Sequence, residues 1–441
     1  MRMSRTVVLV VVVLACVLAL PAYALAVKPP ATQSLDERVA TLEQTVTSLQ
    51  AMDASQNAMI SALRDQVGGL QAMDASQDAR IGELESRIGS LQAIDASQSA
   101  HIAGLESSNV MKLNPYVSVD TANLNGLTGP HIIFTGANLH IRSGSGATDG
   151  SVNGLGNLII GYDEKAGTTE AMRIGSHNLV IGRLHKWTSY GGFVAGSENS
   201  LLEPAATVSG GMGNTASGSF SSVSGGQYNS AVGDYSSVSA GYGSGAYGPF
   251  SAVSGGYNHR ATGDYSSVSG GQGNEASGIY ASVSGGSGNV ASYDWSAVSG
   301  GLINSASGKG SSLSGGVHNS AMGYGASVTG GNYNAASGDL SAVTGGQYNT
   351  AVGAYSSVSA GYGSGAYGLF SAVSGGYNHR ATGDYSSVSG GQGNEASGIY
   401  ASVSGGSGNT ASGEGSTVSG GAVRSAVNLY DWWGGGLFQD Q

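Results

Sequence analysis

A valine stands at every fifteenth position from Val208 to Val418, with Leu313 once in its place, over fifteen consecutive units without an insertion. Counted from this residue as position 1, the unit reads V-S-G-G-x-x-N-x-A-x-G-x-(aromatic)-S-x. Fixed columns at so short a period predict a solenoid, in which each column stacks on itself along the axis. Such a unit is too short for a helical hairpin but long enough for two short strands and two turns. We therefore expect a mainly β chain, with a parallel β-solenoid of regular 15-residue repeats over residues 207–426.

The columns of the unit indicate which side chains point inward. Ser-x-Val-Ser-Gly alternates as a strand does, which predicts an inward valine. Glycine at positions 3, 4 and 11 is expected to supply turns with positive φ. Asparagine at position 7 predicts a ladder of side-chain amides that satisfies polar groups of the turns; ligand binding by this column is the alternative. The structural columns are represented by Val223, Val238, Val253, Val268, Asn214, Asn229, Asn274, Ala231 and Gly233.

An aromatic residue fills position 13 in most units. Two interpretations stay open. The rings either pack between coils or subunits, or form a surface on which sugars stack. The aromatic residues that could face a ligand are Tyr235, Tyr265, Tyr280, Trp295, Tyr355, Tyr385 and Tyr400.

The interior expected for one coil is small, because it holds one valine, one alanine and some glycine. Ordering a residue costs about 1 to 2 kcal/mol, which so little apolar burial does not easily offset. This favours association of several chains. Residues 227–289 and 347–409 are near-identical at an offset of eight whole units. A block that duplicates in whole units is interpreted as added length rather than as a unique site.

Residues 34–109 carry apolar side chains at alternating spacings of four and three, which predicts an α-helical coiled-coil stalk. The segment also repeats every three heptads, and each copy places an aspartate and a glutamine on the apolar seam. These layers are expected to set the register, with a bound ion as the alternative. Leucine at one seam position and valine or isoleucine at the other is more typical of a dimer than of a trimer. The polar seam residues are Asp53, Gln56, Asp74, Gln77, Asp95 and Gln98.

The N-terminus predicts export. Arg2 and Arg5 precede an apolar run that ends in Ala22-Tyr23-Ala24, so residues 1–24 read as a signal peptide and 25–33 as a linker. The run is too short for a membrane span, and no other segment suggests a transmembrane anchor. The only cysteine, Cys16, lies inside the run. Lipoprotein attachment at Cys16 is the minor alternative to a secreted or surface-exposed chain.

The remaining segments suggest no chemistry. Residues 110–150 are expected to form a β collar with strands over 130–134 and 138–142, residues 151–206 irregular coils, and 427–441 a cap, with a docking peptide as the alternative. A net charge of −11 argues against nucleic-acid binding. The eight histidines are scattered without metal-ligand spacing, and no catalytic constellation stands out. We predict no enzyme activity, no metal site and no cofactor.

The repeat resembles the head of YadA-type trimeric autotransporter adhesins, whose unit is S-x-A-I-G-x-x-A-x-A-x-G-x-x. Gly226, Asn229, Ala231 and Gly233 match its spacing, and this unit is one residue longer through its doubled glycine. Gly182, Gly196 and Gly210 lie 14 residues apart, which is the spacing of the family's unit. The resemblance covers roughly residues 150–425. Here the stalk precedes the head, and the C-terminal segment is too short for the family's barrel anchor.

This resemblance implies a left-handed parallel β-roll, a homotrimer, and an adhesive role at a bacterial cell surface. We therefore expect a non-enzymatic structural or adhesive fibre, a repeat head on a coiled-coil stalk that binds host matrix, glycans or other cells. The trimer is favoured over the dimer on the strength of the resemblance. The alternatives are a glycan- or ice-binding solenoid and a purely structural coat or spacer protein.

Overall fold

The computed structural model describes residues 34–162, 164 and 172–434. The chain divides into two compact units, Met1–Asn138 and Leu139–Gln441, and each is considered by itself. The predicted signal peptide, the linker and Cys16 lie outside the described residues, as do the last seven residues of the predicted cap.

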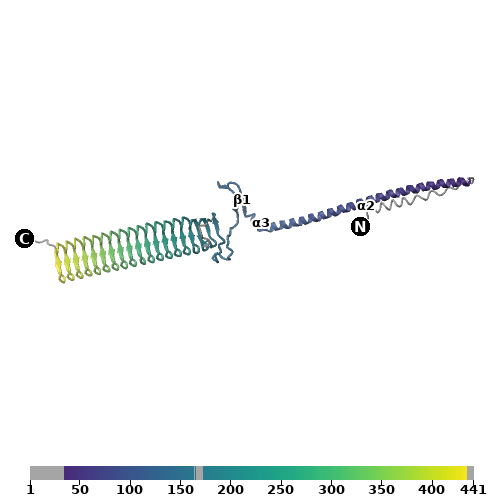
Figure 1. Ribbon diagram of the computed structural model, residues 1–441. Coiled ribbons are helices and arrows are strands. Elements are labelled where there is room, and N and C mark those ends of the chain that lie inside the picture. Colours follow the sequence, from purple (N-terminus) through teal and green to yellow (C-terminus); the bar gives the residue numbers. More distant parts are fainter. Residues whose placement is uncertain (1–33, 163, 165–171, 435–441) are drawn as a thin grey trace, which may run out of the picture. The chain divides into compact units, whose positions relative to one another are not determined.

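The first unit is dominated by α2 (Leu35–Ser107), a helix of 73 residues (Figure 1). A capping box starts it, because the Ser34 hydroxyl accepts the Glu37 N–H and the Glu37 carboxylate accepts the Ser34 N–H. None of its side chains is buried. At 1.5 Å per residue the helix is about 110 Å long. The helical prediction is confirmed, although the structure shows one long helix rather than a coiled coil.

The short helix α3 (Asn109–Leu113) follows, and then β1 (Val117–Asp120) pairs antiparallel with β2 (His131–Phe134). The expected strand over 130–134 is thus present as β2. The structure has no strand over 138–142, so that prediction is wrong. Strand β2 pairs with β1 instead, and residues 138–142 lie where the chain passes from the first unit to the second.

The second unit is a parallel β-solenoid, visible in Figure 1 as stacked coils. Each strand pairs in parallel with the equivalent strands one coil before and one coil after it, as β10 does with β8 and β12. Two sheets result, and successive strands of the chain alternate between them through the regular coils. The valine sheet, which carries the position-1 column, contains β3 (Leu158–Ile160), β4 (Leu179–Arg183), β6 (Phe193–Ser197), β8 (Thr207–Val208), β10 (Ser222–Val223), β12 (Ser237–Val238), β14 (Ala252–Val253), β16 (Ser267–Val268), β18 (Ser282–Val283), β20 (Ala297–Val298), β22 (Ser312–Leu313), β24 (Ser327–Val328), β26 (Ala342–Val343), β28 (Ser357–Val358), β30 (Ala372–Val373), β32 (Ser387–Val388), β34 (Ser402–Val403), β36 (Thr417–Val418) and β38 (Trp432–Trp433).

The alanine sheet, which carries the position-9 column, contains β5 (Lys186–Trp187), β7 (Ser200–Leu201), β9 (Thr215–Ala216), β11 (Ser230–Ala231), β13 (Gly245–Ala246), β15 (Arg260–Ala261), β17 (Glu275–Ala276), β19 (Val290–Ala291), β21 (Ser305–Ala306), β23 (Ser320–Ala321), β25 (Ala335–Ala336), β27 (Thr350–Ala351), β29 (Gly365–Ala366), β31 (Arg380–Ala381), β33 (Glu395–Ala396), β35 (Thr410–Ala411) and β37 (Ser425–Ala426). The predicted mainly β parallel solenoid is confirmed.

The coil becomes one residue longer at the doubled glycine. Val194 pairs with Val208 at the shorter step, whereas Ser197 bridges to Met212 at a step that is one position longer. The extra residue therefore lies between positions 1 and 5 of the coil, where Gly210-Gly211 replaces a single glycine. All later pairings keep the longer step, as Val223 with Val238 does.

The three glycine columns differ in what they require, which corrects the expectation that all three supply positive φ. In the regular coils up to residue 406, only position 4 is left-handed: Gly226 has φ +83°, and a Cβ there would strike the carbonyl oxygen of Gly241 in the next coil. Position 11 has no positive φ, but a Cβ on Gly233 would strike the carbonyl of Gly248. Position 3 is open, and alanine occupies it in two coils, at Ala240 and Ala360.

The interior is fuller than the sequence predicted. The valine and alanine columns are fully buried, and so are the asparagines at position 7 and the serines at position 14. Alanine replaces the buried serine at Ala206, Ala281, Ala326 and Ala401, so this column tolerates loss of its hydroxyl. Each coil thus buries four side chains rather than two, and the apolar columns form one continuous cluster within a single chain.

Candidate functional site

The buried asparagine column forms a continuous hydrogen-bonded ladder. The Asn214 Oδ1 accepts the backbone N–H of Asn229 at 2.9 Å. The Nδ2 of Asn229 donates to the Gly225 carbonyl of its own coil at 3.0 Å and to the Gly241 carbonyl of the next coil at 2.9 Å. Asn274 repeats the pattern with Gly270 and Gly286. Both ends of each amide are thus used inside the solenoid, as a structural ladder requires.

Serine and histidine continue the ladder where asparagine is replaced. Ser244 Oγ accepts the N–H of His259 at 3.2 Å, and His259 Nδ1 accepts the N–H of Asn274 at 3.1 Å. Ser364 and His379 do the same in the second copy. Each replacement keeps the acceptor for the next coil. Both histidines are therefore structural members of the ladder.

Burial disfavours the charged form of these imidazoles. Desolvation lowers the pKa of His259 and His379 below the ordinary 6.5, partly offset by backbone hydrogen bonds that raise it. Since Nδ1 accepts a hydrogen bond, it carries no proton in this arrangement. Protonation at Nδ1 would remove the acceptor that the next coil uses.

The position-13 aromatic residues form two stacked runs on the surface. Neighbouring rings lie nearly parallel, with centroids 4.9 Å apart for Tyr235 and Phe250 and 4.7 Å apart for Tyr265 and Tyr280. We call this column the aromatic ladder. Its residues are about half exposed: Phe220, Tyr235, Phe250, Tyr265, Tyr280 and Trp295 in one run, and Tyr355, Phe370, Tyr385 and Tyr400 in the other.

Every residue of the aromatic ladder has a positive φ, 57° at Tyr235 and 56° at Trp295. For a bulky residue this conformation costs about 1 to 2 kcal/mol. Glycine adopts it freely and occupies the same column at Gly310, Gly325 and Gly415. Stacking of an aromatic pair returns about 0.5 to 1.5 kcal/mol, so the rings bring little net stability over glycine.

Ring orientation distinguishes the two interpretations of the ladder. Inside each run, both faces of a ring are covered by its neighbours, and Lys309 Nζ lies 4.8 Å from the Trp295 ring centroid at the end of the first run. What the ladder exposes is therefore ring edges and tyrosine hydroxyls. The rings pack between coils, which leaves no free ring face inside the runs on which a sugar could stack.

A second aromatic column was missed from the sequence. Tyr242 and Tyr257 at position 5 stack at 5.5 Å, and Tyr228 at position 6 meets Tyr242 edge-on at 5.7 Å. The same arrangement recurs at Tyr348, Tyr362 and Tyr377. These positions vary between units, so no consensus letter marks them. The recurrence of tyrosines inside the duplicated block is the signal that could have revealed them.

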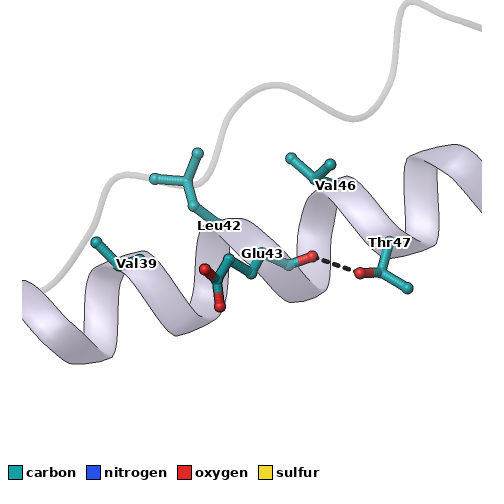
Figure 2. Close-up of a pocket in the computed structure, with 5 residues that line it drawn as sticks. All are labelled: Val39, Leu42, Glu43, Val46 and Thr47. Carbon is teal, nitrogen blue, oxygen red and sulfur yellow. Dashed lines mark hydrogen bonds between the residues drawn. The ribbon is translucent and has the colours of Figure 1, made fainter.

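Helix α2 offers an apolar strip rather than an enclosed site. Val39, Leu42 and Val46 project from one side of the helix and remain exposed, with Glu43 and Thr47 beside them (Figure 2). The Thr47 hydroxyl donates to the Glu43 carbonyl, as expected within a helix. The strip continues along the predicted seam through residues such as Leu84 and Leu91.

The described residues contain no group of three or more His, Cys, Asp or Glu side chains placed to hold a metal ion. Within the same residues, no helix is both long and apolar enough to cross a membrane. Carboxylates of the array instead support the turns: Asp234 and Asp384 accept backbone N–H groups of the preceding coil, from Ser219 and Leu369.

Comparison with known protein families and with curated proteins found no match for this chain.

Proposed function

We propose that this protein is a non-enzymatic, exported structural and adhesive fibre, in which the solenoid is the contact surface and α2 joins several chains. The observation that carries the proposal is the half-exposed aromatic ladder, held in a backbone conformation that glycine would adopt without strain. Stacking offsets little more than the conformational cost of these rings. Their presence therefore indicates that the exposed ring edges are used in binding.

The exposed apolar strip of α2 supports association of chains. Leucine, isoleucine and valine at heptad spacing stay in solvent on a single helix, and burying one such side chain contributes about 1.5 to 3 kcal/mol. A second and a third copy of α2 would cover that strip. We propose a parallel homotrimer with left-handed rolls, as the likeness to YadA-type heads implies, with a dimer as the alternative.

Uniform construction supports a contact surface rather than a catalytic centre. The same inward columns repeat from coil to coil, and the array offers rows of repeated surface groups along its length. A fibre of this kind suits multivalent attachment to matrix, glycans or other cells. A coat or spacer protein is the alternative, and it predicts no dependence on the aromatic ladder.

Two measurements test the proposal. Sedimentation of the full chain is expected to give a trimer. Deletion of residues 34–109 is expected to give a smaller particle that keeps its β signal in circular dichroism.

Beads coated with the full chain are expected to be retained under flow on matrix-coated or glycan-coated surfaces. Tyr235→Gly with Tyr265→Gly should reduce that retention, and Ser237→Gly with Ser267→Gly serves as the control. Beads that adhere to none of the surfaces would leave only the spacer function.

A further inference from the structure

The duplicated block carries a distinct surface cluster on the outer face of the alanine sheet. Glycine occupies position 8 only at Gly245 and Gly365 in the regular coils, and tyrosine occupies position 10 only at Tyr247 and Tyr367. Arginine occupies position 8 only in the coil that follows each of them, at Arg260 and Arg380. The three residue types therefore occur together, twice, eight coils apart.

The structure explains why these residues occur together. A Cβ on Gly245 would strike the ring of Tyr247, so the ring lies flat over the glycine and buries it. Arg260 is the register partner of Gly245 on the neighbouring strand, and its guanidinium carbon lies 5.1 Å from the Tyr247 ring centroid. Gly365, Tyr367 and Arg380 repeat this arrangement, with a guanidinium-to-ring distance of 5.4 Å. The ring thus fixes an arginine in place on an exposed face.

The guanidinium of each cluster is available to a partner. Arg260 and Arg380 are exposed, and no carboxylate of the described residues comes within ion-pair distance of either one. Glu275 and Glu395 are their neighbours in the following coil, yet each guanidinium lies over the tyrosine ring of the preceding coil. An arginine held against a ring keeps its planar fork of N–H donors, which matches a carboxylate in a bidentate manner. Tyrosine and arginine are also among the residue types enriched at the energetic hot spots of protein interfaces.

We propose that the cluster of Gly245, Tyr247 and Arg260, and its copy at Gly365, Tyr367 and Arg380, are two equivalent docking sites for a protein that presents a carboxylate beside apolar side chains. This names a partner class for the adhesive function proposed above and rests on it. The array has eight carboxylates against four basic side chains, so it repels an extended polyanionic polysaccharide. A single carboxylate on an otherwise apolar protein surface meets the arginine without that penalty.

Two copies on one rigid array make the attachment bivalent. With strands about 4.8 Å apart, eight coils separate the clusters by about 38 Å. A partner with two carboxylate-bearing sites at that span gains effective concentration at its second contact. The duplication of residues 227–289 as 347–409 then adds a second binding site as well as length, which revises the interpretation made from the sequence.

The test uses a displayed library of random twelve-residue peptides, selected on the immobilised full-length chain. Enriched peptides are expected to carry Asp or Glu next to aromatic or aliphatic residues. One such peptide is then synthesised singly and as a tandem pair joined by about 45 Gly/Ser residues, a flexible length that matches the span. Interferometry compares both forms on the full chain and on variants.

Arg260→Gln with Arg380→Gln is expected to weaken binding at least tenfold, and either substitution alone to abolish the advantage of the tandem peptide. Lys309→Gln removes another array cation that lies over a ring but is not part of either cluster, and it should leave peptide binding unchanged. The proposal is overturned if no acidic peptides are enriched, if Lys309→Gln weakens binding as much as the arginine variants, or if alginate competes as well as the peptide. Bead retention that survives while peptide binding fails would overturn these sites and leave the adhesive function standing.

Discussion

Helix α2 and the solenoid differ in whether a single chain buries its own apolar side chains. No side chain of α2 is buried, and its backbone hydrogen bonds join residues within one helical turn. In the solenoid, valine, alanine, asparagine and serine are buried within a single chain, by bonds that join successive coils. A need for partner chains therefore arises mainly from the helix. The thin interior expected of the coils, which suggested the same need, is filled by the two polar columns.

Breaking the seam of α2 should give the largest effect. Leu84→Ser with Leu91→Ser in the full chain removes two leucines per chain, each worth about 2 to 5 kcal/mol once buried between helices. We expect the oligomer to dissociate and the helical signal at 222 nm to fall, while the β signal of the solenoid persists. Sedimentation and circular dichroism measure the two parts separately.

Glu83→Ser with Ala93→Ser, on the outer positions of the same turns, is the matched control and should leave the mass unchanged. Dissociation of neither variant would mean that α2 does not join the chains. Loss of the β signal together with the helix would mean that the solenoid also depends on association, contrary to its self-contained core.

Breaking the asparagine ladder should give the next largest loss of stability, and this loss should occur in the solenoid. Asn304 donates to the carbonyls of Gly300 and Gly316 and accepts the N–H of Asn319. Asn304→Ala leaves that N–H without its partner in the core and should cost about 3 kcal/mol. Asn304→Ser keeps the acceptor, as Ser244 does, and should cost about half as much.

Hydrogen exchange at the Asn319 amide, together with denaturant unfolding, measures the loss. Faster exchange should be confined to the neighbouring coils, because each coil of a solenoid contacts only its neighbours. Equal losses for Ala and Ser would contradict the role assigned to the acceptor.

The columns of strict residues were predictable because each has one physical reason. Valine and alanine recur without exception or nearly so, and asparagine in ten of the fifteen units; their inward positions and the amide ladder followed from alternation and turn chemistry. The doubled glycine was correctly identified as the source of the extra residue. Where the extra residue lies within the coil became clear only from the structure, through the pairing of Val194 with Val208 and of Ser197 with Met212.

The parts that escaped prediction depend on what lies one coil away. Positive φ at Tyr235 is set by the turn and not by residue type, since aromatic residues do not favour it. The closed contact of Gly233 with Gly248 explains a glycine column with no unusual φ. The cluster around Tyr247 needs residues from two coils, and a consensus of single coils does not contain it.

Histidine in the ladder makes two coils sensitive to acid, an effect of intermediate size. The pKa of His259 and His379 is lowered by burial, so below pH 6.5 the unfolded chain binds more protons than the folded chain. The free energy of unfolding should therefore be level above pH 6.5 and fall as the pH drops below it. Ser244 and Asn274, the ladder neighbours of His259, are uncharged, and Arg260 lies on the outer face.

His259→Asn with His379→Asn restores the common ladder residue and serves as the matched variant. Its unfolding midpoint, followed from pH 8 to pH 5, should lose this dependence, while the carboxylate titrations common to both chains remain. Identical pH profiles for the two chains would show that the imidazoles titrate alike in both states.

The smallest effect should come from the other polar column of the core. Ser341 is buried, but its hydroxyl has no hydrogen-bond partner among the described residues, and the preceding coil has Ala326 at the same place. Ser341→Ala should change the free energy of unfolding by less than about 0.5 kcal/mol, because no bond is lost. Ser296→Ala is the contrast, since its hydroxyl donates to the Tyr293 carbonyl at 2.6 Å, and it should cost about 1 kcal/mol. Denaturant midpoints at an unchanged slope measure both. Equal costs would mean that the serine column bonds throughout, and that the solenoid core is held by two polar ladders rather than one.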